Sequence, residues 1–422
     1  MTSGNGRPRL LIYSQDGLGL GHLRRTTLLA AQFLRASPEA NVLTVCDSPA
    51  GPFFTPPPGH DHIKLPSVRK LRPGEWSAVS LSLSFPAVLD LRKEMIRTTA
   101  LSFDPDVLLV DHMPHGAMGE LLPTLKALSS RPVRIVLGLR DILDAPETIR
   151  RRWHLEGAFE AVRQYFDDVL VYGSQDVFDV AASYGWPEEL LDRVQYCGYI
   201  CSSAPVPEGD SVRSEHLDGS PDGELVVAMA GGGADASPLF ETLLRSVPAI
   251  TAQRRCSFVV ITGPFLPEPE RARLEELAQG HPVRILTTVP DSLEFLAAAD
   301  LVVAMAGYNT TAEILKVGAP ALLVPRPGPS AEQTMRASRL ADRGWVRWLP
   351  PDSLSADTLA EAVTDTLANP RLEPPRGPDL LGLQRAARHL VDGTTAELRR
   401  ERVLPAIIAP PPRHRAAALD EG

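Results

Sequence analysis

The sequence predicts an α/β protein made of two doubly wound halves, each built on a mainly parallel sheet. Three observations carry this prediction. Short apolar runs alternate with helical stretches, each half opens with a strand, a glycine turn and a helix, and a polar stretch separates the halves. The length of 422 residues suits two or three domains.

The composition is typical of a globular protein and excludes several classes. Hydrophobic residues make up 44% and charged residues 23% of the chain, and the formal net charge is −9. That balance argues against a nucleic-acid binder, because such a protein needs a basic face. The chain has no apolar run of about 18 residues and no signal-peptide core at its start. Its four cysteines are scattered, so we expect a reducing, cytoplasmic setting.

The first half is expected to begin with a buried strand from Arg9 to Ser14. The turn DGLGLGH follows, and then a helix from His22 to Ala36. Residues 51–74 are rich in proline, histidine and basic residues, so we expect a long loop there. A second helix is expected over residues 85–102. The remaining strands of this half are predicted over residues 41–46, 106–111, 133–138 and 169–172.

The second half restarts the same pattern after Pro205 to Gly223, a polar stretch that we predict to be a linker. A helix should start at Ser237, as N-cap, with Pro238 in the first helical position. The strands of this half are predicted over residues 224–230, 257–262, 283–286, 300–304 and 321–324. The predicted parts of the chain are therefore domains 1–204 and 224–403, the linker 205–223 and a loose tail 404–422.

The turn after the first strand is the first candidate ligand site, because open α/β sheets bind ligands at the carboxyl ends of their strands. Gly17, Gly19 and Gly21 let the backbone approach a ligand, and the helix start presents free N–H groups. The dinucleotide fingerprint GxGxxG fails by one position, because His22 stands where the last glycine belongs. A tight turn with a locally bonded histidine is the alternative interpretation.

Asp111 ends a predicted strand and should lie on the same rim as His22. A carboxylate beside an imidazole raises its basicity and fixes its tautomer, as a general base requires. Alternatively, Asp111 caps the turn HMPHG that follows it. The histidine pairs of the chain lack a third ligand nearby, so no metal site is predicted.

Two turns of the second half carry further candidates. AGGGAD offers backbone amides to an anion. In AGYNTTAEIL a helix should start near Asn309 or Thr310, and Glu313 one turn later is suited to accept the hydroxyls of a ribose. The spacing from Thr310 to Glu313, like that from Ser330 to Gln333, also fits a capping box, which needs no ligand.

These loops, in this order, resemble glycosyltransferases of the GT-B fold, in which two Rossmann-like domains with parallel sheets face each other across a cleft. The specific part is AGYNTTAEILKVGAPALLVPRPGPSAEQTMRASRLADRG, which is similar to the signature of the branch that contains the cell-wall lipid I N-acetylglucosaminyltransferase. GLGLGH resembles that family's glycine-rich loop ending in histidine. VDHMPHGAMGEL, LGLRDILDAPETIRRRW and VYGSQDVFD resemble a bacterial subgroup of predicted glycosyltransferases. The resemblance covers roughly residues 9 to 395.

The resemblance implies roles for single residues. Glu313 would hold the donor ribose, the backbone of Val289 would meet the nucleobase, and Glu332 and Gln333 would meet the donor sugar. His22 would face the reacting centre. The whole implied donor site is Gly19, Gly21, Gly231, Gly232, Val289, Gly307, Tyr308, Asn309, Thr310, Glu313, Glu332 and Gln333. The turns AGYNTT and GLGLGH depart from the cell-wall enzyme, which argues against lipid I as acceptor.

The implied reaction is a single, inverting displacement on a UDP- or TDP-linked sugar. His22, oriented by Asp111, would remove the proton of the acceptor hydroxyl. Backbone amides and helix termini would stabilise the leaving diphosphate, so neither a metal nor a cofactor is predicted. The alternatives are a nucleotide-sugar hydrolase, a sugar 2-epimerase, an NAD-dependent oxidoreductase and a protein that only senses the nucleotide sugar.

The first half of the chain should bind the acceptor, which could be a small molecule, a glycan or a lipid-linked molecule. The region concerned is residues 51–76 together with the turn HMPHG. Arg69, Lys70, Arg72 and Trp76 would suit an anionic acceptor or a membrane surface. A solvated loop explains them more simply, so we expect at most a weak membrane association.

Overall fold

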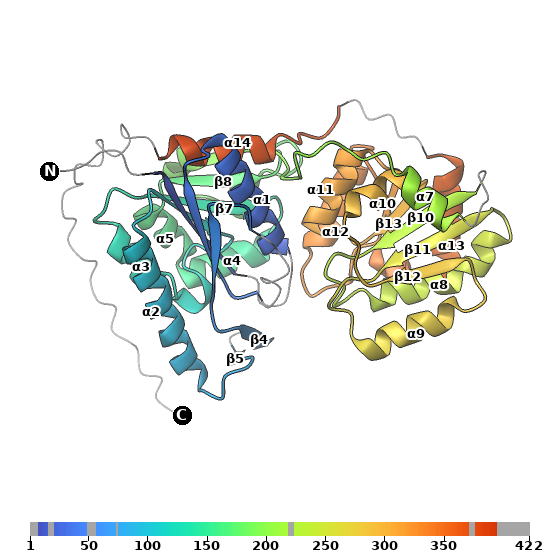
Figure 1. The fold of residues 1–422 in the computed structure, drawn as a ribbon, viewed down its shortest axis with the longest axis horizontal. Coiled ribbons are helices and arrows are strands. Elements are labelled where there is room, and N and C mark those ends of the chain that lie inside the picture. Colours follow the sequence, from blue (N-terminus) through green and yellow to red (C-terminus); the bar gives the residue numbers. More distant parts are fainter. Residues whose placement is uncertain are drawn as a thin grey trace.

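The computed structural model describes residues 7–15, 21–48, 56–72, 75–217, 223–370 and 376–394, which form two α/β domains side by side (Figure 1). The first domain contains a seven-stranded sheet of order β3-β2-β1-β6-β7-β8-β9, and the second a six-stranded sheet of order β12-β11-β10-β13-β14-β15. All neighbouring strands in both sheets are parallel. The predicted fold class is therefore confirmed.

The strands of the first sheet are β1 (Arg9–Ser14), β2 (Asn41–Cys46), β3 (His60–Lys64), β6 (Val107–Asp111), β7 (Arg134–Arg140), β8 (Asp168–Tyr172) and β9 (Val194–Tyr196). β4 (Val68–Arg72) and β5 (Glu75–Ala78) form a separate antiparallel hairpin. The helices of this domain are α1 (Gly21–Ala36), α2 (Phe85–Phe103), α3 (Leu122–Leu128), α4 (Pro146–Glu156), α5 (Ala158–Tyr165) and α6 (Val180–Tyr184). Short 3-10 helices span Ala117–Gly119 and Glu188–Arg193.

The second domain has the strands β10 (Glu224–Met229), β11 (Cys256–Ile261), β12 (Val283–Leu286), β13 (Leu301–Ala304), β14 (Ala321–Leu323) and β15 (Arg347–Trp348). Its helices are α7 (Asp210–His216), α8 (Ser237–Thr251), α9 (Glu268–Ala278), α10 (Ser292–Ala298), α11 (Tyr308–Val317), α12 (Glu332–Ala341) and α13 (Ala356–Ala368), with a 3-10 helix over Pro351–Ser353. The last helix, α14 (Gly382–Asp392), packs against α1 of the first domain.

The apolar runs that predicted the strands are buried because helices cover both faces of each sheet (Figure 1). In β1 every residue from Leu10 to Ser14 is buried. Every strand predicted from the sequence is present, with ends within two residues of those expected. No described helix has the length and apolar character needed to span a membrane. All four cysteines are buried free thiols.

Three predictions of local structure were wrong. Residues 60–64 and 68–72, expected in a loop, form β3 and β4, because a polar edge strand such as HDHIK pairs through its backbone and shows no apolar run. The expected linker 205–223 contains α7, which buries Val212 and His216. Ala236, not Ser237, occupies the N-cap position of α8.

The end of the predicted second domain packs against the first domain. Leu383, Ala386 and Leu390 of α14 belong to the core that α1 helps to form, so this part of the predicted second domain returns to the first. The loose tail predicted over residues 404–422 lies outside the described residues. The boundaries 1–204, 205–223 and 224–403 otherwise remain predictions.

Candidate active site

The first turn of α1 brings two candidate side chains, His22 and Arg25, to Asp111 at the carboxyl end of β6. His22 Nδ1 lies 2.5 Å from Asp111 Oδ2. Arg25, one turn later, bonds both oxygens of Asp111 through Nη2, at 2.9 Å and 2.7 Å. Asp111 and Arg25 are both buried, whereas His22 keeps 18% of its side chain exposed. The predicted pair of His22 and Asp111 is therefore formed, and Asp111 does not cap the HMPHG turn.

The charge states in this cluster follow from the pairing. Burial alone would raise the pKa of Asp111, but the charges of Arg25 and His22 hold it well below its usual range. Asp111 is thus a carboxylate, which can only accept hydrogen bonds. Its short contact with His22 Nδ1 therefore places a proton on that nitrogen. In the neutral form of this imidazole the lone pair is then on Nε2, as a general base requires.

A second imidazole lies against the first. The rings of His22 and His112 are 5.1 Å apart, and His112 has a backbone φ of 82°. Left-handed backbone is uncommon for a residue with a side chain and is found most often at functional sites. Burial, followed by the charges of Arg140 and His22, holds the pKa of His112 well below its usual range. His112 is therefore neutral near pH 7.

In the second domain, two turns offer backbone groups close to each other. Gly307 occupies the N-cap position of α11, and no side chain caps that helix start. Gly231 has a φ of 60°, and a Cβ at this position would lie 3.6 Å from Thr310 Oγ1. Gly232 is tighter, because an added Cβ would meet the ring of Phe265 at 3.2 Å. The two glycine turns thus present their backbone at one place, as a diphosphate site requires.

Glu313 is buried one turn into α11, and the first domain contacts it directly. Arg24 Nη2 lies 2.5 Å from Glu313 Oε1, and Ser292 Oγ donates to Glu313 Oε2 at 3.1 Å. The helix begins at Tyr308, so Thr310 is not its N-cap and the capping-box interpretation of Glu313 is wrong. Burial raises the pKa of Glu313, although the charge of Arg24 and the bond from Ser292 partly offset it.

The other residues at the start of α11 bond across the domain boundary. Asn309 Nδ2 donates to the carbonyl of Gly21 at 2.9 Å. The ring of Tyr308 is buried, its hydroxyl accepts from the backbone of Ile200, and Arg25 lies 5.5 Å from the ring centroid. The Tyr308 side chain therefore packs between the domains, and only its backbone is left to serve a diphosphate.

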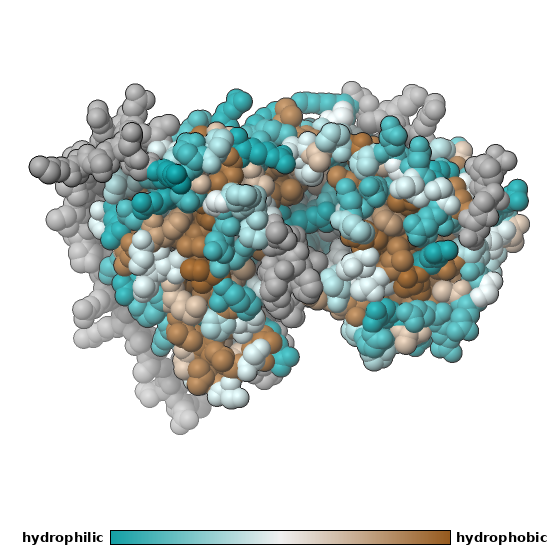
Figure 2. Space-filling view, in the orientation of Figure 1, coloured by the Kyte–Doolittle hydropathy of each residue, from teal (hydrophilic) through white to brown (hydrophobic). Residues whose placement is uncertain are grey.

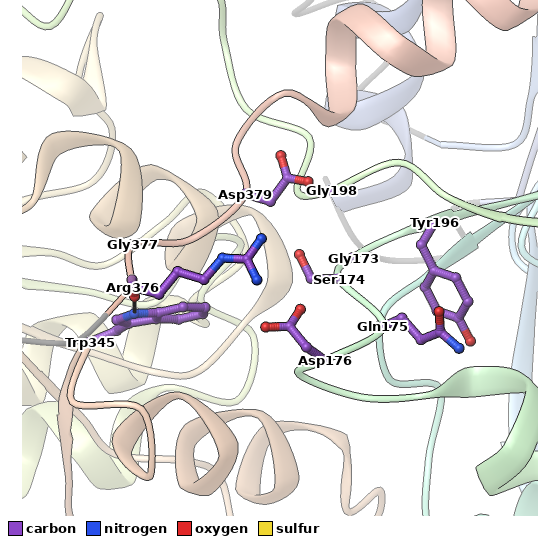
Figure 3. A pocket seen from close by; sticks show the side chains of 10 residues that line it. All are labelled: Gly173, Ser174, Gln175, Asp176, Tyr196, Gly198, Trp345, Arg376, Gly377 and Asp379. Carbon is purple, nitrogen blue, oxygen red and sulfur yellow. Dashed lines mark hydrogen bonds between the residues drawn. The ribbon is translucent and has the colours of Figure 1, made fainter.

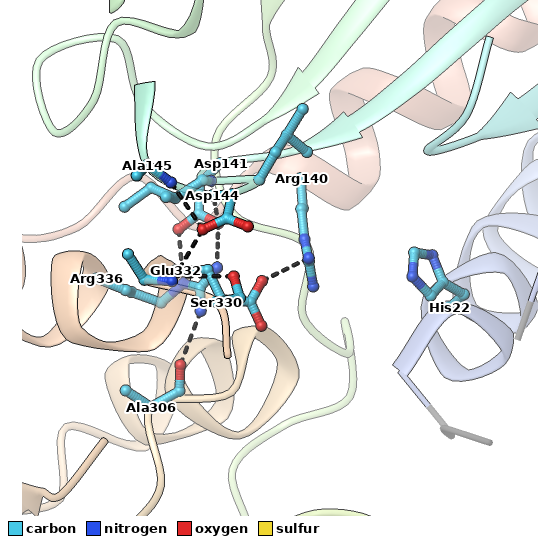
Figure 4. Close-up of polar contacts among 12 residues, drawn as sticks. His22, Arg140, Asp141, Asp144, Ala145, Ala306, Ser330, Glu332 and Arg336 are labelled. Atoms are coloured by element: carbon cyan, nitrogen blue, oxygen red, sulfur yellow. Dashed lines mark hydrogen bonds and ion pairs between the residues drawn. The ribbon is translucent and has the colours of Figure 1, made fainter. Parts of the chain in front are cut away.

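The loop after β7 meets the start of α12, as Figure 4 shows. Asp141 accepts two hydrogen bonds from Arg336, and both residues are buried. Asp144 accepts from the backbone of Ala331, and Arg140 Nη2 lies 2.5 Å from Glu332 Oε2. These contacts fix the predicted donor-sugar residue Glu332 beside the first domain.

Gln333 is buried and accepts from the backbone of Arg326 at 3.2 Å, so Ser330 and Gln333 do not form a capping box. Val289 is partly buried against the hydrophobic core. A Cβ added at Gly21 would lie 3.8 Å from Asn309 Nδ2. Gly19 lies outside the described residues. The ligand roles predicted for these residues remain predictions.

Sequence reasoning missed the arginines that complete the site: Arg24, Arg25, Arg140 and Arg336. For Arg25 the sequence did offer a signal, because this residue follows His22 by one helical turn and so lies on the same face of the helix. Among the described residues, no group of three or more His, Cys, Asp and Glu side chains is placed to hold a metal ion.

A separate cavity of about 420 Å³ lies where the chain crosses between the domains (Figure 3). The loop after β8 lines it together with Tyr196, Gly198, Trp345, Arg376, Gly377 and Asp379. Trp345 Nε1 donates to the carbonyl of Arg376 at 2.6 Å. None of the described candidate residues lines this cavity, so it is distinct from the site around His22.

Comparison with solved structures defines the class of fold. A MurG from Acinetobacter baumannii matches with a TM-score of 0.54 and 16% identity, over 92% of this chain and 99% of that one. The kitacinnamycin glycotransferase matches with a TM-score of 0.57 and 18% identity, over 95% and 100%. A UDP-N-acetylglucosamine 2-epimerase from Listeria monocytogenes, described as putative, gives 0.58 and 12%, over 92% and 95%. The chain has the GT-B fold.

The second domain is similar to a particular family within that class. Residues 226–387 match the glycosyltransferase family 28 C-terminal domain. The UDP-N-acetylglucosamine--N-acetylmuramyl-(pentapeptide) pyrophosphoryl-undecaprenol N-acetylglucosamine transferase of Burkholderia lata is 35% identical over 142 residues, which are 33% of this chain and 39% of the relative. The Lactococcus lactis enzyme of that name is 27% identical over 147 residues, 35% and 41% respectively. The match thus spans about two fifths of these relatives and confirms the resemblance stated from the motifs.

The raised pKa of Glu313 and the lowered pKa of Asp111 predict opposite effects on stability. A carboxyl whose pKa rises on folding stabilises below its unfolded pKa, about 4.3, and loses that stability as the pH rises through the folded value. Glu313→Gln should therefore increase the free energy of unfolding at pH 7 relative to wild type, and this gain should vanish at pH 4. Urea unfolding at both pH values measures the difference.

Asp111→Asn is the matched comparison. The lowered pKa of Asp111 contributes stability above about pH 3.9 that is lost as the pH falls through the folded value. The substitution should therefore destabilise the protein at pH 7 and less so near pH 3. Equal pH dependence in the two variants would contradict the charge states assigned here.

Proposed function

We propose that the chain is a glycosyltransferase that moves a sugar from a nucleoside-diphosphate sugar to an acceptor hydroxyl, with inversion. One observation carries the proposal: the His22–Asp111 pair of the first domain is adjacent to α11, whose Glu313 and open N-terminus suit a nucleoside diphosphate. The match of the second domain to family 28 supports the same donor class. UDP or TDP is the expected carrier.

In the proposed reaction, the acceptor hydroxyl attacks the anomeric carbon while its proton passes to His22 Nε2. The imidazolium that forms is stabilised by the carboxylate of Asp111, which remains ionised because Arg25 pairs with it. The bond to the diphosphate breaks as the new bond forms. The N–H groups at the start of α11 and the turn of Gly231 and Gly232 stabilise the leaving charge. The proposal needs no metal ion and no cofactor.

The donor site is tested by thermal unfolding with UDP, TDP, GDP, ADP and NAD, with and without EDTA. One nucleoside diphosphate at 100 times its Kd should add about 2.7 kcal/mol of stability, and EDTA should not remove the effect. Glu313→Ala should lose most of this stabilisation, whereas His22→Ala should keep it, because His22 serves the reaction and not the nucleotide. Stabilisation by NAD alone, or by none of these ligands, would contradict the proposed donor class.

The base is tested by turnover of the sugar nucleotide whose diphosphate stabilises the protein. His22→Ala should lower kcat about 10²- to 10⁴-fold while the Kd of the diphosphate stays within twofold. Release of the diphosphate, followed by a coupled assay with and without candidate acceptors, measures the rate. A rate within a few fold of wild type would show that His22 is not the base, and equal release without acceptor would indicate a hydrolase.

We also propose that an exposed apolar area of the first domain rests on a lipid surface. Val79 and Leu83, between β5 and α2, expose 45% and 53% of their surface, and Leu81 of the same segment and Leu91 of α2 are also exposed. Figure 2 shows hydrophobic surface at the lower end of this domain, where α2 and the hairpin lie. Arg69 is exposed on the hairpin, so anionic lipids are the expected partner.

Sedimentation with vesicles of phosphatidylcholine and phosphatidylglycerol tests this surface. The double substitution Leu81→Ser and Leu83→Ser should lower the bound fraction at least fivefold, because it removes buried apolar area from the bound state. Leu155→Ser is the control, since Leu155 is 76% exposed on α4, outside this area. Equal loss in the control, or no binding by wild type, would contradict a lipid-facing surface.

A further inference from the structure

Arg140 lies within the candidate active site but has no role in the proposed reaction. It ends β7, next to β6, and the register pairs Asp111 with Gly138, two residues before Arg140. Figure 4 shows its guanidinium between Glu332 of the second domain and the imidazole of His22. A cation therefore lies between the proposed base and the residue predicted to meet the donor sugar.

Arg25 and Arg336 each bond both oxygens of one carboxylate, whereas Arg140 does not. Arg25 bonds both oxygens of Asp111, and Arg336 bonds both oxygens of Asp141. Arg140 instead shares Glu332 with Arg326, which lies 3.7 Å from that carboxylate. Burial lowers the pKa of Arg140, Glu332 and Asp141 partly offset this, and the charges of Arg336 and Arg25 add to the lowering. Arg140 and Arg326 thus share the carboxylate of Glu332.

Three buried nitrogen atoms beside this point have no hydrogen-bond partner among the described residues. They are Arg140 Nε, Arg152 Nε and His112 Nδ1. The charges of Arg140 and Arg152 both lower the pKa of His112. The nearest carboxylate to Arg152 is Glu156, at 4.0 Å. Buried polar groups are normally hydrogen-bonded, so these three nitrogen atoms are available to a ligand.

The chemistry of these three side chains indicates which kind of ligand they would bind. Guanidinium groups bind phosphate and carboxylate through parallel N–H donors, and a neutral imidazole adds one further donor or acceptor. All three side chains belong to the first domain, whereas the glycine turns and Glu313, suited to the donor, belong to the second. The anion should therefore come from the acceptor.

We propose that Arg140, Arg152 and His112 form an anion subsite that selects an acceptor with a phosphate or carboxylate group close to its attacking hydroxyl. The closeness follows from the place of Arg140 beside His22, which takes the proton of that hydroxyl. Arg140 is then a specificity-determining residue. This inference rests on the proposed function, because the hydroxyl and its base are defined there.

Inorganic phosphate is the probe for this subsite, titrated at constant ionic strength against chloride and followed by thermal unfolding. Wild type should bind phosphate equally well with and without a saturating nucleoside diphosphate. Arg140→Gln should weaken phosphate binding at least tenfold while the Kd of the diphosphate stays within twofold. Arg326→Gln, which removes the other cation beside Glu332, is the matched control and should change phosphate affinity less than twofold.

A second variant distinguishes loss of the anion subsite from a folding defect in Arg140→Gln. His112→Asn keeps a residue that tolerates the left-handed backbone and should weaken phosphate binding several-fold. Phosphate that competes with the diphosphate would assign the anion to the donor and overturn the acceptor subsite. Unchanged phosphate affinity in Arg140→Gln, or no phosphate binding by wild type, would also overturn it. Diphosphate binding itself is measured separately, so failure of the donor site would be seen independently.

Discussion

The buried ion pair of Arg25 and Asp111 is the interaction on which the rest of the site depends. A buried carboxylate without a partner would take up a proton or destabilise the fold. Arg25 keeps Asp111 ionised, and Asp111 in turn fixes the proton on His22 Nδ1. The same guanidinium lies over the ring of Tyr308 from the second domain. The pair therefore sets the state of the base and helps to join the two domains.

The first turn of α1 links the proposed base of one domain to the proposed donor-binding residues of the other. Arg24 contacts Glu313, the backbone of Gly21 accepts from Asn309, and His22 lies between these contacts and Asp111. In the proposed reaction, a nucleotide that displaces Arg24 from Glu313 would act on the helix that carries the proposed base, His22.

The sequence could predict whatever depends on local pattern or on strand order. Apolar runs placed most of the strands, and the rule that parallel strands end at one edge placed His22 and Asp111 on the same rim. Contacts across the domains could not be predicted, because they depend on how the two domains are oriented. Asp141 and Arg336 are separated by 195 residues, and no spacing connects them. Thr310 and Glu313 fitted a cap by spacing alone, yet the helix starts at Tyr308 and Glu313 faces Arg24 instead.

The most direct measurement of the central claim is a crystal structure with the nucleoside diphosphate that stabilises the protein. The ribose hydroxyls should lie on Glu313 and the diphosphate at the start of α11 beside Gly231 and Gly232, with His22 still bonded to Asp111. A nucleotide bound elsewhere, or a ribose without contact to Glu313, would contradict the claim that the two domains share one glycosyl-transfer site.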